Sequence, residues 1–200
     1  MQTPKYELKW FFDSAPDIDL EAFIPVFHHW IQNQCLEELL IDVADYRHVH
    51  NGPGVMLIAH DAHYAIDATD GRQGLLYSRR RETHPSRRHI EDTRERLASV
   101  FLCALSACQR LETEAALQGQ LRFRTDGFTL RVNDRLHAPN THEAFHVVYE
   151  ALAPFLRTLY ADQEVAVSHA SDTASRLTIE IQAPDNPGVE TLLTRLGVAV

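Results

Sequence analysis

The stretch THEAFH, residues 141–146, has the His-Glu-x-x-His pattern by which a single helix binds zinc in many metalloproteases. In a helix, His142 and His146 would lie one turn apart on one face and could both bind the metal. Glu143 would then act as the general base that activates a bound water. The pattern therefore raises the hypothesis of a zinc-dependent hydrolase.

Two features of the surrounding sequence weigh against that hypothesis. Pro139 and Asn140 place His142 in the first turn of the expected helix, whereas a catalytic histidine pair is needed well inside one. A catalytic zinc also requires a third ligand, and no recognisable downstream pattern supplies it. We therefore keep the zinc hydrolase as an alternative hypothesis only.

Aromatic residues and histidines are frequent in the first half of the chain. The whole chain has 12 histidines. Imidazoles that converge could bind zinc, iron or haem, but no known metal spacing is complete, and we predict no cofactor. We expect instead a cleft that binds an apolar or aromatic small molecule. The residues proposed to line it are Trp10, Phe12, Tyr46, His48, His60 and Tyr64.

A basic segment, residues 71–96, holds eight arginines against four acidic residues in a chain whose net charge is −9. Its simplest interpretation is a solvated strand end followed by a helix start. The alternative is a patch that binds an anion or a partner. That patch would consist of Arg79, Arg80, Arg81, Arg87 and Arg88.

The composition limits the class of protein. The negative net charge argues against nonspecific nucleic-acid binding. No apolar run reaches the roughly 18 residues needed to cross a membrane, and the first residues lack the order of a signal peptide. The three cysteines have no paired spacing, which favours free thiols in a reducing compartment. These features predict a soluble, cytoplasmic protein.

Hydrophobic periodicity predicts strands and helices in alternation along the 200 residues. Strands are expected at 6–12, 41–46, 55–67, 75–81, 164–170 and 176–183, and a hairpin at 121–132 turns at Asp126–Gly127. Helices are expected from Asp19, over 87–118, over 141–160 and near 187–197. The longest helix, 87–118, carries one apolar stripe and ends at Gly119.

The two ends of the chain correspond when the sequence is shifted by 122 residues. Glu-Ala-Phe at 21–23 then falls on Glu-Ala-Phe at 143–145, and Asp19 falls on Thr141, both good helix N-caps. Each half reads strand–helix–strand–strand. This order of elements resembles the doubled modules of the bacterial effector-binding and SOUL haem-binding proteins. The resemblance implies a ligand-binding role by analogy and assigns no functional residue.

The sequence thus predicts an α+β fold with mainly antiparallel strands. We expect a first half at 1–84, a long connecting helix at 85–119 and a second half at 120–200, all in one compact domain. The expected function is a small-molecule-binding or regulatory module with a cleft between related halves. A further alternative is a partner-binding homodimer that assembles through the long helix and its arginine-rich start.

Overall fold

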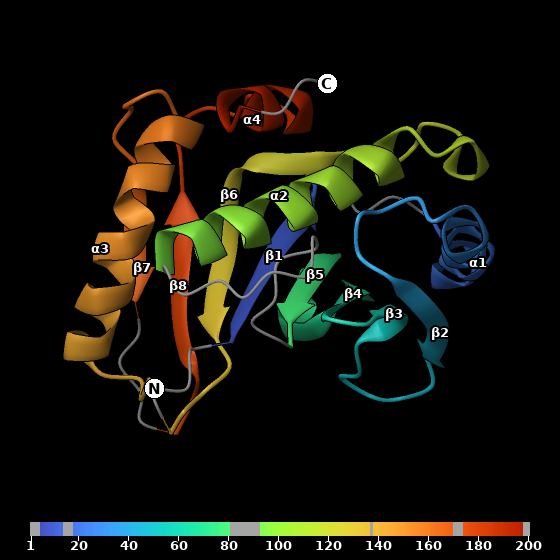
Figure 1. The fold of residues 1–200 in the computed structure, drawn as a ribbon, viewed down its shortest axis with the longest axis horizontal. Helices are drawn as coiled ribbons and strands as arrows, with labels where there is room; N and C mark the ends of the chain where they lie inside the picture. Colours follow the sequence, from blue (N-terminus) through green and yellow to red (C-terminus); the bar gives the residue numbers. More distant parts are fainter. Residues whose placement is uncertain (1–4, 14–17, 81–92, 137, 170–173, 198–200) are drawn as a thin grey trace.

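The chain folds into one antiparallel sheet of eight strands with four α-helices, as described for residues 5–13, 18–80, 93–136, 138–169 and 174–197 of the computed structural model (Figure 1). The α+β prediction is therefore confirmed. The strand order is β2-β3-β4-β5-β1-β6-β8-β7. The strands are β1 (Tyr6–Phe12), β2 (Leu40–Tyr46), β3 (Gly54–Ala59), β4 (Ala62–Asp67), β5 (Gly74–Arg79), β6 (Phe123–Val132), β7 (Ala166–His169) and β8 (Leu177–Gln182).

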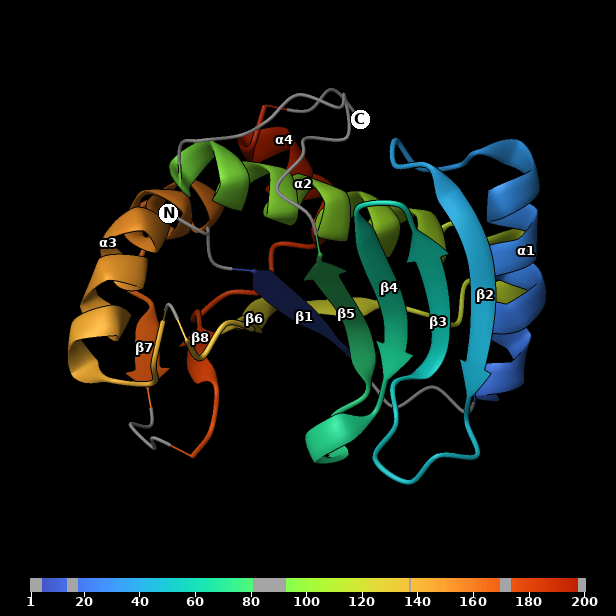
Figure 2. The ribbon, with the colours of Figure 1, turned by 60° about the horizontal axis from the view of Figure 1, so that its bottom comes forward.

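The four helices lie on one side of the sheet (Figures 1 and 2). They are α1 (Phe23–Asn33), α2 (Thr93–Glu112), α3 (His142–Leu159) and α4 (Val189–Arg195). The helix α2 crosses the sheet between α1 and α3 and packs on β1 and β5. Its Phe101 contacts Phe128 of β6 and Phe155 of α3, with ring centres 5.3 and 5.8 Å apart. The core therefore lies between the sheet and these helices.

Strand alternation divides β1 between two environments. Successive side chains in a strand point to opposite faces of the sheet. Tyr6, Leu8 and Trp10 point to the helices and are almost fully buried. Glu7, Lys9 and Phe11 consequently point to the other face of the sheet, which no described helix covers (Figure 2). We call this second surface the open face.

Two helical segments start as the sequence predicts. Asp19 accepts a hydrogen bond from the backbone N–H of Glu21 at 2.9 Å and caps a 3-10 turn, η1 (Leu20–Ala22), that leads into α1. Thr141 accepts one from the N–H of Ala144 at 3.2 Å and caps α3. Both side chains satisfy a donor that a helix start leaves unpaired.

The structure does not confirm the internal repeat. The first half supplies five strands, β1 to β5, and the second half supplies three, β6 to β8. The shift of 122 residues places β3 on β8, yet β8 pairs directly with β6 whereas β4 and β5 separate β3 from β1.

Two turns differ from the sequence-based prediction. The run 55–67 is not one strand, because it reverses at His60–Asp61 between β3 and β4. The predicted hairpin at Asp126–Gly127 does not form, and β6 continues through these two residues with a bend (Figure 1). Strand pairing explains this: Gly127 is opposite Gln182 of β8, and the next residue, Phe128, is opposite Trp10 of β1.

The apolar stripe of the predicted long helix packs inside the molecule. Leu97, Phe101, Ala104, Cys108 and Leu111 are buried. The helix ends at Glu112, so Ala115 is exposed in the 3-10 turn that follows. The expected start of the helix, up to residue 92, lies outside the described residues.

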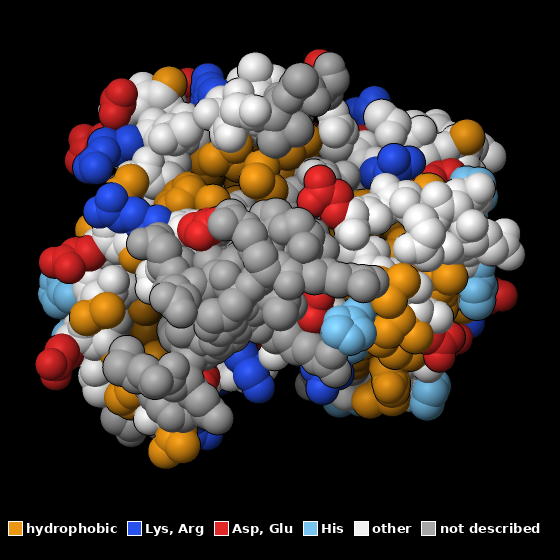
Figure 3. Space-filling model, viewed as in Figure 1, with side chains coloured by type: hydrophobic (Ala, Val, Ile, Leu, Met, Phe, Trp, Pro, Cys, Tyr) orange, Lys and Arg blue, Asp and Glu red, His pale blue; other side chains and the backbone are white. Residues whose placement is uncertain are grey.

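The surface in Figure 3 shows hydrophobic side chains gathered on the right, where Figure 1 draws β2 and β3. Leu39, Ile41, Tyr46 and Val49, in and beside the edge strand β2, are indeed exposed. Within the part of the chain that the structure describes, no helix combines the length and the apolar character that a membrane span requires.

Candidate functional site

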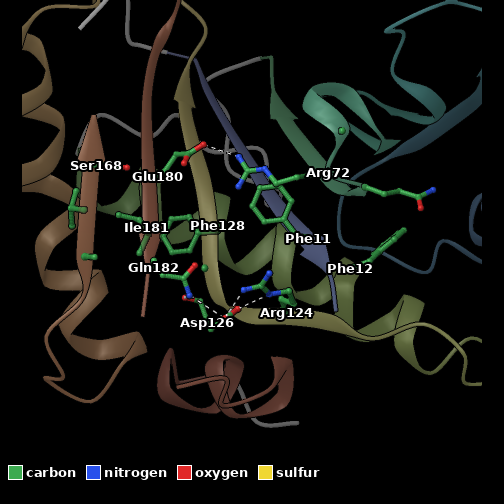
Figure 4. A pocket seen from close by; sticks show the side chains of 15 residues that line it. Phe11, Phe12, Arg72, Arg124, Asp126, Phe128, Ser168, Glu180, Ile181 and Gln182 are labelled. Atoms are coloured by element: carbon green, nitrogen blue, oxygen red, sulfur yellow. Dashed lines mark hydrogen bonds and ion pairs between the residues drawn. The ribbon is translucent and has the colours of Figure 1, made fainter. Parts of the chain in front are cut away.

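A hollow of about 340 Å³ lies on the open face, over β1, β6, β8 and β7 (Figure 4). Both halves of the chain line it. The first half contributes Phe11, Phe12, Gly71, Arg72 and Gln73, and the second half contributes Arg124, Asp126, Gly127, Phe128, Ala166, Val167, Ser168, Glu180, Ile181 and Gln182. Its size falls in the range of small-molecule sites. We call it the central hollow.

The ring of Phe11 stands between two charged borders of the central hollow (Figure 4). Arg72 reaches over this ring, with its guanidinium carbon 4.2 Å from the ring centre. The same guanidinium donates from Nη2 to Glu180 Oε1 at 2.7 Å. Because Arg72 precedes β5 and Glu180 lies on β8, this pair spans the two strands between them, β1 and β6.

The opposite border consists of Arg124, Asp126 and Gln182. Arg124 donates from Nε and Nη2 to the two carboxylate oxygens of Asp126, at 3.1 and 2.7 Å. Gln182 donates to Asp126 Oδ2 at 3.0 Å. The hydrogen bonds from Arg124 lower the pKa of the Asp126 carboxyl below its ordinary value. Asp126 is therefore ionised at neutral pH, and the border carries one charge of each sign.

Gly127 keeps the floor of the central hollow open between these borders. A Cβ at this position would come within 2.6 Å of the carbonyl oxygen of Ile181 and 3.1 Å of the side chain of Gln182. A larger residue would displace the amide that contacts Asp126. The neighbouring edge strand β7 also presents small side chains here, Ala166 and Ser168.

A buried ion pair supports the turn that carries Arg72. Lys9 Nζ lies 2.6 Å from Asp67 Oδ2, and the two side chains are 3% and 1% exposed. Lys9 also donates to the carbonyl of Thr69 at 3.1 Å, and Thr69 donates its hydroxyl to Asp67 at 2.6 Å. These bonds fix the start of the 3-10 turn η2 (Thr69–Gly71), so they position the residues that follow it.

A second polar cluster lies among the helices, on the opposite face of the sheet. Glu38 is 2% exposed and accepts hydrogen bonds from the hydroxyls of Tyr64 and Tyr77, at 2.7 and 2.9 Å. Arg79 donates to the Tyr77 hydroxyl at 2.6 Å and to Ser99 Oγ at 2.9 Å. Burial raises the pKa of Glu38, and the nearby Arg79 opposes that rise.

This Glu38 cluster offers little room for a ligand. The adjoining hollow measures about 120 Å³ and reaches Glu38, Tyr64 and Cys103. Burial raises the pKa of the Cys103 thiol to about 12, so the thiol is protonated at neutral pH and is a poor nucleophile. The polar groups bind one another, which favours a structural role.

The residues predicted to line a cleft are distributed over three places. Trp10, Phe12 and Tyr64 belong to the core on the helix side, although Phe12 also borders the central hollow. Tyr46 and His48 come together at a separate hollow of about 470 Å³ beside the β2–β3 turn. His60 is half exposed and lies 2.9 Å from Asp61 Oδ1.

The arginines predicted as a surface patch do not share one surface. Arg79 is 3% exposed in the Glu38 cluster, because its position in β5 turns it toward α2. Arg80 is on the surface and contacts His63 Nε2 at 2.8 Å. Arg81, Arg87 and Arg88 lie outside the described residues.

The histidines of the THEAFH motif are exposed on α3. His142 is the first residue of that helix, as its preceding residues predict, and Glu143 and His146 also face solvent. The ring of His142 lies 5.6 Å from that of His169 on β7. Among the described residues, no group of three or more His, Cys, Asp or Glu side chains is placed to hold a metal ion.

The sequence reasoning missed Phe11, Arg72, Arg124, Asp126 and Glu180. The sequence held a signal for Phe11, because residues 7, 9 and 11 of a strand share one face and Phe11 thus lies on the face of the charged residues Glu7 and Lys9. The others come together only through pairing of β1 with β6 and β6 with β8.

Neither a protein-family model nor a curated protein matches the chain.

Proposed function

We propose that this protein is a small-molecule-binding module and that the central hollow is its binding site. The observation that carries the proposal is a hollow of about 340 Å³ lined jointly by both halves of the chain, with an aromatic ring between two ion-paired borders. Sites for small molecules combine apolar walls with a few fixed polar groups in this way.

The lining favours a ligand with a flat apolar centre and polar ends. Phe11 and the open floor at Gly127 can accept an aromatic or aliphatic portion. The pairs Arg72–Glu180 and Arg124–Asp126 present both donors and acceptors at the two borders. A ligand of this kind agrees with the apolar or aromatic molecule that the sequence predicts.

Binding explains the lining better than catalysis. The described residues that line the central hollow include no histidine, cysteine or lysine. Its two carboxylates each accept a hydrogen bond from an arginine, so both are already held in ion pairs.

Fluorescence titration with phenylnaphthylamine, an uncharged aromatic probe, tests the proposal. Ser168→Trp places a large ring in the central hollow from the edge strand and should weaken probe binding by about tenfold or more, because the ring occupies the space that the probe needs. Phe11→Ala should weaken it for the opposite reason, because it removes apolar contact area from the wall of the hollow. Val147→Trp makes a comparable change on α3, at a side chain that is 66% exposed, and serves as the control.

The proposal fails if phenylnaphthylamine does not bind, or if it binds equally to the wild type, Ser168→Trp and Phe11→Ala. Thermal unfolding of each variant, measured without probe, separates a lost site from a lost fold.

A further inference from the structure

A second hollow of about 660 Å³ adjoins the central hollow on the open face, and the two share Gly71, Arg72 and Glu180. We infer that this adjoining hollow binds an oxyanion, a carboxylate or a phosphate. The inference rests on the proposed function in one respect: the oxyanion belongs to the molecule whose apolar part occupies the central hollow.

The charges around the adjoining hollow support an anion. Three guanidinium groups line it, those of Arg72, Arg131 and Arg176. Two carboxylates accompany them, because Glu180 lines the hollow and Glu7 lies 3.0 Å from Arg176 and 3.9 Å from Arg131. Among the described side chains that line this hollow or contact its arginines, three are positive and two are negative, in a chain whose net charge is −9.

Two of the arginines keep donors for a ligand. A guanidinium has five N–H donors in a planar fork that matches a carboxylate or a phosphate. Arg176 contacts Glu7 through Nη1, and Arg72 contacts Glu180 through Nη2. Their side chains are 40% and 47% exposed, so the remaining donors can be reached from solvent.

Glu7 holds this arrangement in place. It is 6% exposed, and Asn133 donates to its Oε1 at 2.8 Å while Arg176 donates to its Oε2. The buried carboxylate thus fixes Arg176 beside Arg131 rather than neutralising both. Thr69 and Thr178 also line the hollow, but their hydroxyls donate to Asp67 and to the carbonyl of Arg176, so the arginines are the donors for a ligand.

The pair Arg72–Glu180 lines both hollows, and Figure 4 shows its hydrogen bond beside Phe11. A ligand with an apolar part over Phe11 and an oxyanion beside Arg176 would pass along this pair. Arg72 can contact both parts, because it already stacks on Phe11 and carries further N–H donors. The geometry therefore joins the two hollows into one site for an amphipathic anion.

Two fluorescent probes that differ by one oxyanion test the inference: phenylnaphthylamine and its sulfonated analogue anilinonaphthalene sulfonate. The wild type should bind the sulfonate about tenfold more tightly at low salt, the effect of a charge-assisted hydrogen bond. Arg176→Gln should remove most of that difference and leave the uncharged probe unaffected. Arg157→Gln, at an exposed arginine on α3, is the matched control and should change neither value.

Competition by benzoate and by phenyl phosphate identifies which oxyanion the site prefers. Inorganic phosphate alone, followed by thermal shift in the wild type and Arg176→Gln, tests the adjoining hollow without any apolar group. Added salt should weaken the sulfonate more than the uncharged probe.

Equal affinities of the two probes for the wild type would overturn the inference, as would a sulfonate preference that survives Arg176→Gln. In either case, binding of the uncharged probe that Ser168→Trp abolishes would leave the proposed function standing. Conversely, anion binding that depends on Arg176 without binding of the uncharged probe would refute the proposed function and retain the anion site.

Discussion

Replacing Lys9 with methionine should destabilise the protein strongly although Lys9 lies on the open face of the sheet. The substitution keeps most of the side-chain volume and removes the ammonium group 2.6 Å from Asp67. Since the two side chains are 3% and 1% exposed, the carboxylate left behind is buried without its cation. Removing one partner of such a pair costs about 3–5 kcal/mol.

The lower end of that range is expected here. Asp67 keeps the N–H and hydroxyl of Thr69, at 3.2 and 2.6 Å, so some of its hydrogen bonds survive. A loss of about 3 kcal/mol is still a large part of the 5–15 kcal/mol by which a typical domain is stable. Exchanging both partners for apolar residues, Lys9→Met with Asp67→Leu, should cost less than the sum of the single changes.

Urea unfolding followed by tryptophan fluorescence measures the effect, because both tryptophans, Trp10 and Trp30, are fully buried. The control is Arg72→Met, which breaks a pair whose side chains are 47% and 50% exposed. An exposed pair contributes about 0.2–1 kcal/mol. If Lys9→Met costs no more than Arg72→Met, the reasoning from burial is refuted.

Three further results are expected. Glu38→Ala removes the acceptor of two buried tyrosine hydroxyls and should lower the free energy of unfolding in urea by about 2–4 kcal/mol. Glu38→Gln keeps an acceptor oxygen and should lower it by about 1 kcal/mol, so equal losses would contradict the hydrogen-bond argument. Stability should fall as pH rises above about 10, because burial raises the phenol pKa in the folded state and the unfolded chain then loses its protons first; a urea midpoint that stays constant up to pH 11 would contradict this. The tyrosines concerned are Tyr6, with a pKa of about 12, and Tyr64, Tyr77 and Tyr160. Protein purified without chelator should hold no stoichiometric zinc, because His142 and His146 are exposed on α3 without a third ligand among the described residues; one zinc per chain, lost in His146→Ala, would restore the hydrolase hypothesis.

Local patterns predicted the helices and strands where one face of an element is apolar and the other polar. The last two strands of the chain, β7 and β8, and the helices α3 and α4 lie close to their expected ranges. Asp19 and Thr141 cap helical segments as their residue types indicate. The turn between β3 and β4 was missed because His60–Asp61 contains neither glycine nor proline, the usual signals. The Asp126–Gly127 pair misled for the opposite reason, since its glycine serves close strand packing rather than a turn.

The site was less predictable because it depends on which strands are neighbours. Trp10 and Phe12 were natural choices as large aromatic residues, but in β1 they share the face of Tyr6 and Leu8 and enter the core. Phe11 has the opposite direction and reaches the open face. Arg72 and Glu180 are 108 positions apart, and their contact follows from a strand order that local sequence does not encode.

The burial of the charged residues of β1 supports the proposal that the open face binds a ligand. An antiparallel sheet with one covered face normally exposes polar residues to water on the other. Here Glu7, Lys9 and Asp67 on that face are at most 6% exposed, so they bear the cost of burying charge. Lys9 and Asp67 hold the turn before Arg72, and Glu7 holds Arg176. The buried charges therefore hold two arginines, Arg72 and Arg176, in place beside the hollows that they line. For this reason Lys9→Met should weaken probe binding as well as destabilise the fold.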